Sequence, residues 1–301
     1  MAKNRRAALL HGYVVIDKPG GWTSHDVVGR VRRILRERRV GHAGTLDPAA
    51  VGVLPIAVGN ATRTVEYLAS ASKSYRAEVT FGIETDSADG DGTMIGERQD
   101  VTFSDDDLRA ALRRFEGDQL QVPPMHSAIK VDGRRLYELA RAGLEAEVAP
   151  RPVTVHRIAC VQWASPVATI EIDCSKGTYV RSIARDLGRA LGCGAYLSNL
   201  VRTRTGPFTL ATAMTLHELE DVVERRSWAD FAYHPDVVLQ EYPAAVVGPE
   251  LALAWQQGKR IPVDPCDGPV RVYDAAGRWL GIGSAVEDGR LVQPEKVIVA
   301  E

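Results

Sequence analysis

The sequence has little of what metal, redox and membrane proteins need. Its four cysteines, at positions 160, 174, 193 and 266, are widely spaced, and no Cys-x-x-Cys pair or Cys/His cluster occurs. We therefore expect no zinc site, no redox pair and no other metal, and reduced thiols are typical of a cytoplasmic protein. No apolar run approaches the roughly 20 residues that span a bilayer, and no secretory signal follows the basic start, so no membrane association is expected.

The chain also lacks a strong excess of charge of one sign. Its net charge is -2, which by itself argues against a nucleic-acid partner. The distribution is uneven, however, because residues 1–40 carry ten Lys or Arg against three acidic residues. A local basic surface of this kind attracts phosphates. A solvated helix face is the alternative interpretation of the same arginines.

At 301 residues the chain exceeds the usual size of one domain, so one large and one small domain are expected. Alternating apolar residues predict strands, and amphipathic spacing with capping signals predicts helices. Their mixed order, without the regular spacing of a Rossmann protein, indicates an α+β fold. The predicted strands cover 13–19, 75–81 and 168–174, and the predicted helices cover 24–38, 105–115, 134–142 and a segment ending near 191.

The composition changes after about residue 235. Turn signals at Asp267-Gly268, Ala276-Gly277 and Asp288-Gly289 separate short β-type runs between residues 241 and 301. This spacing predicts a small barrel or sheet-rich module. Because so short a module has a modest core, we expect it to pack against the larger domain.

An acidic, glycine-rich segment at residues 85–92 partly mimics an EF-hand loop. Ser87, Asp89 and Asp91 have the spacing of the first three ligands, but the twelfth position is Arg98 and a strand precedes the segment. Calcium binding is therefore not expected.

The most informative stretch is Val-Gly-His-Ala-Gly-Thr-Leu-Asp-Pro at residues 40–48, directly after the arginine-rich helix. Two glycines relieve backbone crowding, and Pro48 keeps Asp47 out of the helical region. A loop fixed in this way can present one carboxylate from a rigid scaffold. An isolated Asp-Pro pair, by contrast, is usually only a turn.

Three further segments favour a functional loop over an ordinary turn at Asp47. They are Lys-Ser-Tyr-Arg at 73–76, Pro-Met-His-Ser-Ala at 124–128 with Gly-Arg-Arg-Leu-Tyr at 133–137, and Lys-Gly-Thr-Tyr-Val-Arg at 176–181. With the Asp47 string they resemble, in order and spacing, the motifs of the TruB family of pseudouridine synthases, which isomerise uridine 55 in the T-loop of tRNA. The likeness runs from about residue 13 to 206, and more weakly beyond. It implies a mixed, mainly antiparallel catalytic domain at 1–236 and a PUA-like RNA-binding domain at 241–301.

The resemblance also implies roles for individual residues. Asp47 occupies the place of the family's nucleophile. Arg181 would pair bidentately with that carboxylate and keep it charged in a dry pocket. Tyr75 would stack on the target base, and it is a candidate for proton transfer at C5 of that base.

Four more positions match substrate-binding residues of the family. His42 would help to fill the stack that the flipped uridine leaves, and Tyr179 and Leu200 would line the pocket. Arg63 stands where the family often has lysine, which could alter the geometry of a phosphate contact.

The chemistry explains why one carboxylate can suffice. The isomerisation breaks a C–N glycosidic bond, rotates the base and rejoins it through carbon, so no group is oxidised and no water is consumed. A glycosidase needs a second carboxylate to activate water, whereas this reaction needs one nucleophile and no cofactor. Whether Asp47 attacks the sugar or abstracts a proton to form a glycal remains open from the sequence.

The predicted partner is the T-arm of tRNA, with no protein partner required and a monomeric state. Three other functions compete with this prediction. A non-enzymatic tRNA-folding protein would not need Asp47. An RNA-guided synthase acting on another RNA is disfavoured by the compact length and the lack of a long basic tail. A metal-dependent hydrolase would need a ligand cluster that the sequence lacks.

Overall fold

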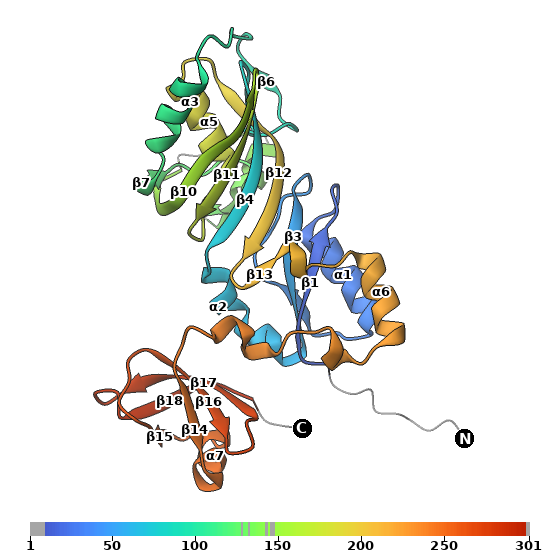
Figure 1. Ribbon diagram of the computed structural model, residues 1–301, viewed down its shortest axis with the longest axis vertical. Coiled ribbons are helices and arrows are strands. Elements are labelled where there is room, and N and C mark those ends of the chain that lie inside the picture. The colour runs from blue at the N-terminus through green and yellow to red at the C-terminus, as the bar shows by residue number, and fades with distance from the viewer. Residues whose placement is uncertain (1–9, 128, 132, 142–143, 145–147, 299–301) are drawn as a thin grey trace.

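The computed structural model describes residues 10–127, 129–131, 133–141, 144 and 148–298. The chain is elongated, with one large sheet running through its upper and middle parts and a small β-rich domain below (Figure 1). The basic residues Lys3, Arg5 and Arg6, the turn residue Asp132 and the predicted helix stop at Ala142 and Gly143 lie outside the described residues.

The large sheet contains nine strands in the order β1-β3-β12-β4-β11-β10-β7, with β2 beside β3 and β13 beside β12. All neighbouring strands are antiparallel except β3 and β12, which run parallel. The predicted α+β class with a mixed, mainly antiparallel sheet is confirmed. The strands are β1 Gly12–Lys18, β2 Val40–His42, β3 Val51–Val58, β4 Lys73–Phe81, β7 Gly117–Gln121, β10 Arg151–Ala164, β11 Val167–Cys174, β12 Ala195–Thr205 and β13 Phe208–Thr209.

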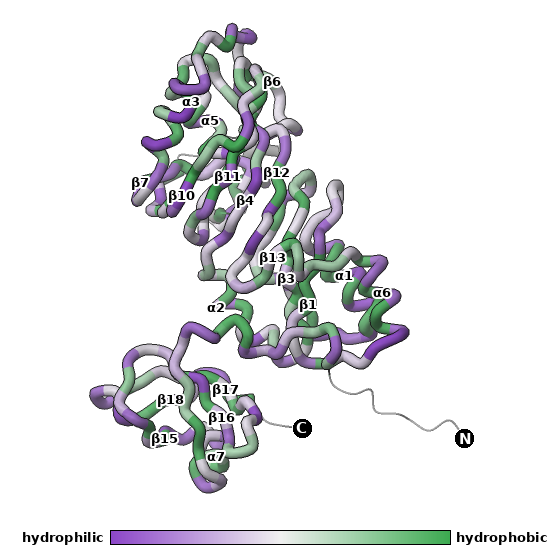
Figure 2. Tube along the Cα trace, viewed as in Figure 1, coloured by the Kyte–Doolittle hydropathy of each residue, from purple (hydrophilic) through white to green (hydrophobic). Residues whose placement is uncertain are grey.

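Alternation of side chains explains these strands. In β4 the residues Tyr75, Ala77, Val79 and Phe81 are buried on one face, while every second residue between them is partly or fully exposed. β1 is different, because both of its faces are covered: Tyr13 and Val15 belong to one apolar cluster, and Val14 and Ile16 to another. Figure 2 shows the hydrophobic residues gathered along these central strands and the inner face of the neighbouring helix.

The helices cover the sheet in two groups. α3 and α5 lie over the upper strands, and α1 and α6 lie beside β1 (Figure 1). The predicted helix from residue 24 begins as expected, with a capping box between Thr23 and Asp26, but it ends at Leu35 because Arg36 takes a left-handed conformation with φ 53°. The helices are α1 Ser24–Leu35, α2 Val65–Ser70, α3 Asp105–Arg113, α4 Leu136–Arg141, α5 Val180–Ala190 and α6 Leu216–Arg225.

Short elements complete the large domain. Two small hairpins are formed by β5 Glu84–Thr85 with β6 Met94–Ile95, and by β8 Lys130–Val131 with β9 Arg134–Arg135. Four 3-10 turns join the larger elements, and the last of them leads into the C-terminal domain. They are η1 Gly59–Thr64, η2 Leu210–Thr212, η3 Trp228–Asp230 and η4 Pro235–Leu239.

The C-terminal domain is a five-stranded sheet in the order β14-β16-β17-β18-β15, so the predicted sheet-rich module is confirmed. The three predicted turns connect its strands, each with a glycine at positive φ. The helix of this domain, α7 Pro249–Gln256, was not predicted, and neither were α2 and α6 of the large domain. Trp255 of α7 is fully buried against the sheet. The strands are β14 Ala244–Val247, β15 Ile261–Pro262, β16 Pro269–Asp274, β17 Trp279–Val286 and β18 Leu291–Val297.

This domain packs against the larger one, as expected for a small core. Trp279 and Ile282 of β17 share an apolar cluster with residues of β1 and β3. Polar contacts surround the cluster: Lys296 Nζ lies 2.8 Å from a carboxylate oxygen of Glu66, and the hydroxyl of Tyr67 donates to Glu295 at 3.0 Å. The two domains therefore share part of their core.

Gly52 permits the one parallel contact in the large sheet. It pairs with Arg202, has φ +101°, and a Cβ added there would lie 2.3 Å from the Arg202 carbonyl oxygen. We expect Gly52→Ala to destabilise the fold by about 3 kcal/mol or more, because both the backbone conformation and the strand spacing oppose a side chain. Urea unfolding measures this loss. Gly29→Ala in α1, where a Cβ meets nothing within 4 Å, is the control and should be neutral or stabilising; equal stabilities would contradict the prediction.

Candidate active site

Asp47 lies in the loop between β2 and β3, where the two halves of the large sheet meet. The loop sits beside the parallel pairing of β3 with β12, and its own main chain makes a turn in which the N–H of Ala50 donates to the Asp47 carbonyl at 3.1 Å. Leu46 and Ala50 on either side are buried in the core of the upper half. Their burial anchors the loop, while the Asp47 side chain itself is 48% exposed.

Arg202 of β12 binds the main chain of this loop before Asp47. It is only 1% exposed, and its guanidinium donates to the carbonyls of Gly44 at 3.1 Å, Thr45 at 3.2 Å and Val53 at 2.8 Å. A buried guanidinium is costly unless its donors are paired, and these three carbonyls supply the pairing. Arg202 therefore fixes the loop backbone just before Asp47.

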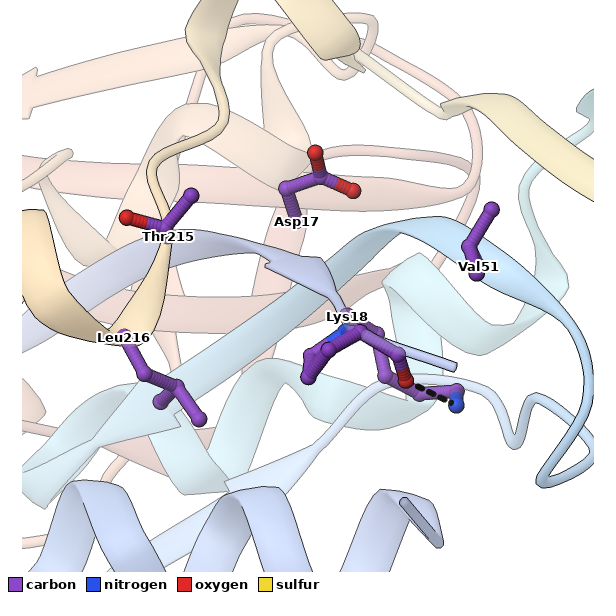
Figure 3. A pocket seen from close by; sticks show the side chains of 6 residues that line it. Asp17, Lys18, Val51, Thr215 and Leu216 are labelled. Carbon is purple, nitrogen blue, oxygen red and sulfur yellow. Dashed lines mark hydrogen bonds between the residues drawn. The ribbon is translucent and has the colours of Figure 1, made fainter. Parts of the chain in front are cut away.

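Lys18 and Ser24 hold the second part of the loop. Lys18 is fully buried at the end of β1, and its ammonium donates to the carbonyls of Pro19 at 2.9 Å (dashed in Figure 3), Trp22 at 2.6 Å and Pro48 at 3.0 Å. The Ser24 hydroxyl donates to the Leu46 carbonyl at 3.1 Å and accepts the Leu46 N–H at 2.9 Å. Thus the residues immediately before and after Asp47 are both fixed.

The predicted ion pair between Asp47 and Arg181 is present, but its geometry differs from the prediction. One guanidinium nitrogen of Arg181 lies 2.9 Å from Asp47 Oδ2, and the other lies 3.3 Å from Asp89 Oδ2. The planar fork therefore joins two carboxylates instead of gripping one bidentately. Asp47 is half exposed, whereas Arg181 has only 6% of its side chain exposed.

Arg181 is held by more than its two acidic partners. It also donates to the carbonyls of His126 at 2.9 Å and Ser87 at 3.4 Å. Arg181 is the second residue of α5, a helix with no acidic residue in its first turn. A cation at a helix N-terminus opposes the helix dipole, so the carboxylates of Asp47 and Asp89 offset an unfavourable placement.

Tyr75 lies on β4 directly opposite Arg202 of β12 and is 8% exposed. Its ring belongs to the same apolar cluster as Leu46, next to the Asp47 loop. Burial raises the pKa of the Tyr75 phenol above its usual value, while the charge of Arg202 acts in the opposite direction. The phenol is therefore protonated at neutral pH.

The other predicted residues fall into two groups. His42 ends β2, and burial lowers the pKa of its imidazole, helped by the charges of Arg202 and His25, so it is neutral at neutral pH. Tyr179 immediately precedes α5, and Leu200 of β12 packs on the core cluster that contains Tyr75.

Arg63 is placed elsewhere. It lies exposed in η1, and its guanidinium donates to the main-chain carbonyl of Val297 in β18 of the C-terminal domain. The structure therefore brings Arg63 to the contact between the two domains and gives it no contact with the Asp47 loop.

Some residues of the predicted basic surface make contacts within the fold. Lys18 is buried beneath the Asp47 loop, Arg30 forms an ion pair with Glu220 of α6, and Arg32 donates to the carbonyl of Val40 at 2.8 Å. Arg33, Arg36, Arg38 and Arg39 of the same region are exposed. Part of the local positive charge therefore serves the fold.

Three residues of the site were missed by sequence reasoning: Asp89, Arg202 and Lys18. Asp89 was noted only as part of a rejected calcium loop, but its carboxylate lies 3.3 Å from the Arg181 guanidinium. No spacing rule could identify Arg202, because its role depends on the pairing of β12 with β3. Lys18 ends a predicted strand, and nothing local indicates that it is buried.

A hollow beside the end of β1 adjoins this site through Lys18. Figure 3 shows five of its lining residues, Asp17, Lys18, Val51, Thr215 and Leu216, and neither Asp47 nor Arg181 belongs to the lining. In the described part of the chain, no three His, Cys, Asp or Glu residues are grouped so that they could hold a metal ion. Nor does any helix among the described residues have the length and apolarity to cross a membrane.

Solved structures with the same architecture identify the class of protein. A crystal structure of a Cbf5-Nop10-Gar1 complex matches 96% of this chain and 85% of that chain with a TM-score of 0.75 and 28% identity. A structure of an H/ACA RNP bound to a substrate RNA containing 2'-deoxyuridine matches 97% of this chain and 86% of that chain, again with a TM-score of 0.75, at 26% identity. The fold is that of the pseudouridine synthases.

Sequence comparison identifies the family. Residues 32–180 match the TruB family pseudouridylate synthase N-terminal domain, residues 181–240 the tRNA pseudouridylate synthase B C-terminal domain, and residues 243–298 the C-terminal domain of pseudouridine synthase II TruB. The tRNA pseudouridine synthase B of Pseudomonas aeruginosa is 43% identical over 96% of both chains. That of Symbiobacterium thermophilum is 53% identical over 72% of this chain and 74% of its own. The chain belongs to the TruB family.

Proposed function

We propose that this protein is a tRNA pseudouridine-55 synthase, which isomerises uridine 55 in the T-loop of tRNA. The observation that carries the proposal is the Asp47 site itself: a half-exposed carboxylate in a fixed loop, paired with the buried Arg181, in a chain of the TruB family. The relatives named tRNA pseudouridine synthase B support the same substrate.

In this proposal Asp47 is the nucleophile. Its Oδ2 lies 2.9 Å from a guanidinium nitrogen of Arg181, and its Oδ1 accepts no hydrogen bond from the described residues. Oδ1 is therefore the atom available to the nucleotide, and the positive charge of Arg181 lies beside the carboxylate that attacks. Asp89 shares the same guanidinium, so it orients Arg181 and does not touch the reacting atoms.

The remaining site residues bind the flipped nucleotide. We assign Tyr75 to stacking on the target base, and Tyr179 and Leu200 to the pocket wall. A neutral His42 can fill the gap that the base leaves in the loop, because an uncharged ring stacks without desolvating a cation. Flipping a loop base costs a few kcal/mol, which stacking contacts of about 1–3 kcal/mol per base offset. Arg63 would bind tRNA only near the contact between the domains.

We divide the chain into a catalytic domain at residues 1–236 and a PUA-like RNA-binding domain at 241–301. The connecting 3-10 turn at Pro235–Leu239, directly before the β14 strand, supports this boundary. We further propose a cytoplasmic monomer that needs no protein partner, because one chain supplies Asp47, Arg181, Asp89 and Tyr75. Light scattering of the purified protein tests the monomeric state.

A direct test is to incubate the purified protein alone with unmodified tRNA transcript and to map pseudouridine by carbodiimide treatment and primer extension. We expect one new stop, at the T-loop position, without any guide RNA. A requirement for a guide RNA, or modification only outside the T-loop, would contradict the proposed function.

The isolated T-arm should be a sufficient substrate. Sequence-specific RNA proteins generally target loop bases that can be splayed out and stacked, and the proposed site contacts only the flipped base and its neighbours. We expect a T-arm stem-loop to be modified at a single-turnover rate within about fivefold of full tRNA, since phosphate contacts outside the arm contribute mainly affinity. A stem-loop that binds but is never modified would show that the rest of the tRNA is required to assemble the site.

A further inference from the structure

The start of α5 is held by a side chain from a distant strand. Gln121, the last residue of β7, is only 4% exposed. Its Oε1 accepts the main-chain N–H of Tyr179 at 2.7 Å, and its Nε2 donates to the carbonyl of the same residue at 3.1 Å. One carboxamide thereby satisfies both main-chain groups of one residue, as a neighbouring strand would.

This arrangement fixes the residue before the helix, because Gln121 bonds the main chain of Tyr179 itself and not the N–H groups of the first turn. Tyr179 is the N-cap residue of α5, and its side chain makes no capping hydrogen bond. Helices usually begin with Ser, Thr, Asp or Asn because the first N–H groups need acceptors. The carbonyl of Tyr179 also accepts the N–H of Ile183 at 3.2 Å, so Gln121 fixes the residue on which the first turn is built.

The chain beyond Gln121 continues across the same turn. The carbonyl of Val122 accepts the Ser182 hydroxyl at 2.9 Å, and the carbonyl of His126 accepts the Arg181 guanidinium at 2.9 Å. The segment that starts at Gln121 therefore contacts the turn of α5 that carries Arg181.

We propose that Gln121 is a positioning residue for the isomerisation: it sets the first turn of α5 so that Arg181 reaches Asp47. This inference rests on the proposed function. Arg181 is two residues from Tyr179, so a displacement of the Tyr179 main chain moves the guanidinium away from contacts of 2.9 Å to Asp47 and 3.3 Å to Asp89. Small misplacements of an active-site group can cost about 100-fold in rate.

Two substitutions at this position test the proposal, with a control on the same strand. Gln121→Met keeps the length of the side chain and removes both hydrogen bonds. Gln121→Glu keeps the acceptor for the Tyr179 N–H and loses the donor. Gln119→Met is the control, because Gln119 lies on the same face of β7 and donates to the Phe115 carbonyl at 2.6 Å, which is not part of α5.

Single-turnover rates and tRNA dissociation constants separate positioning from binding. We expect Gln121→Met to lower the rate by about tenfold or more and to change the dissociation constant by less than about threefold. Gln121→Glu should fall between Gln121→Met and wild type, and it should recover at lower pH, where a protonated carboxyl regains a donor. Gln119→Met should leave both quantities within about twofold of wild type.

A double-mutant cycle tests whether Gln121 acts through Arg181. If it does, the rate loss of Gln121→Met combined with Arg181→Lys is smaller than the product of the two separate losses. Losses that multiply fully would overturn the proposal, as would a weakened tRNA affinity with an unchanged rate.

Hydrogen exchange supplies a measurement that does not depend on activity. Gln121→Met should accelerate exchange at the Tyr179 amide, because that N–H loses its acceptor, while Gln119→Met should not. Unchanged exchange at the Tyr179 amide would overturn the proposed positioning role of Gln121. If wild type fails to modify tRNA, the proposed function is wrong and the positioning role falls with it. If wild type is active and Gln121→Met matches its rate, only the positioning role is wrong.

Discussion

Asp47→Asn is expected to abolish pseudouridine formation while leaving tRNA binding within about threefold of wild type, since the substitution removes the nucleophile and no phosphate contact. The amide is close in size to the carboxylate, and the loop around it is held by Arg202, Lys18 and Ser24 through main-chain atoms that the substitution does not touch. The loop should therefore keep its shape. What is lost is the charge that Arg181 stabilises.

The measurement is single-turnover conversion of tRNA transcript, together with a filter-binding affinity. Asp91→Asn is a matched control, because Asp91 is exposed in the acidic segment that carries Asp89. That variant should retain wild-type turnover. Substantial residual activity of Asp47→Asn, in a preparation free of wild-type enzyme, would falsify the assignment of the nucleophile.

Arg181→Met should reduce the single-turnover rate by about 1,000-fold or more, because it leaves two carboxylates facing each other without the buried cation between them. Arg181→Lys should be intermediate, with a loss of about 10- to 100-fold. An ammonium preserves the charge but cannot present a planar fork to Asp47 and Asp89 together. In both variants tRNA affinity should change far less than the rate.

The comparison requires rates under single turnover, so that product release does not hide the effect. Arg189→Met is the control on the same helix, since Arg189 is exposed and pairs with Glu84 away from Asp47. Its rate should remain within about threefold of wild type, as for most exposed ion pairs. An Arg181→Lys rate equal to wild type would show that the charge alone is sufficient and that the shared fork is unnecessary.

Because Arg181 contacts both Asp47 and Asp89, it constrains the Asp47 carboxylate less than a bidentate pair would. A bidentate pair with Asp47 would immobilise both oxygens of the nucleophile. In the structure one guanidinium nitrogen lies 2.9 Å from Asp47 Oδ2, and the other lies 3.3 Å from Asp89. Asp47 thus stays oriented while one of its oxygens remains available. The same geometry explains why the acidic segment before β6 belongs to the site although it binds no metal in our proposal.

Much of the secondary structure could be predicted because its causes are local. The alternation in residues 75–81 and 168–174 specifies half-buried strands, and the capping pairs Thr23 with Asp26 and Ser104 with Asp107 specify where two helices begin. Helix ends were less predictable. The helix from residue 24 stops at Leu35 because of the backbone conformation of Arg36, which no strong local signal marks.

The sequence alone determined the chemical core of the site. A glycine- and proline-bounded loop around Asp47, together with motifs at Tyr75 and Arg181, indicated the family, and the resemblance to that family implied the roles of Asp47 and Arg181. The motifs are readable because each depends on residue type and spacing within a short segment. The sheet-rich C-terminal domain was readable for the same reason, from turn signals at regular intervals.

Only the tertiary structure decided how that core is held. Arg202 fixes the Asp47 loop because β12 lies parallel to β3, and Asp89 reaches Arg181 because the acidic segment pairs with Leu197 of β12. Gln121 holds the main chain of Tyr179, just before α5, from a separate strand. The partners in these contacts are separated by 58 to 158 positions along the chain. Periodicity and capping rules describe neighbours in sequence, whereas these contacts arise from strand order and from buried polar groups that must find partners wherever the fold places them.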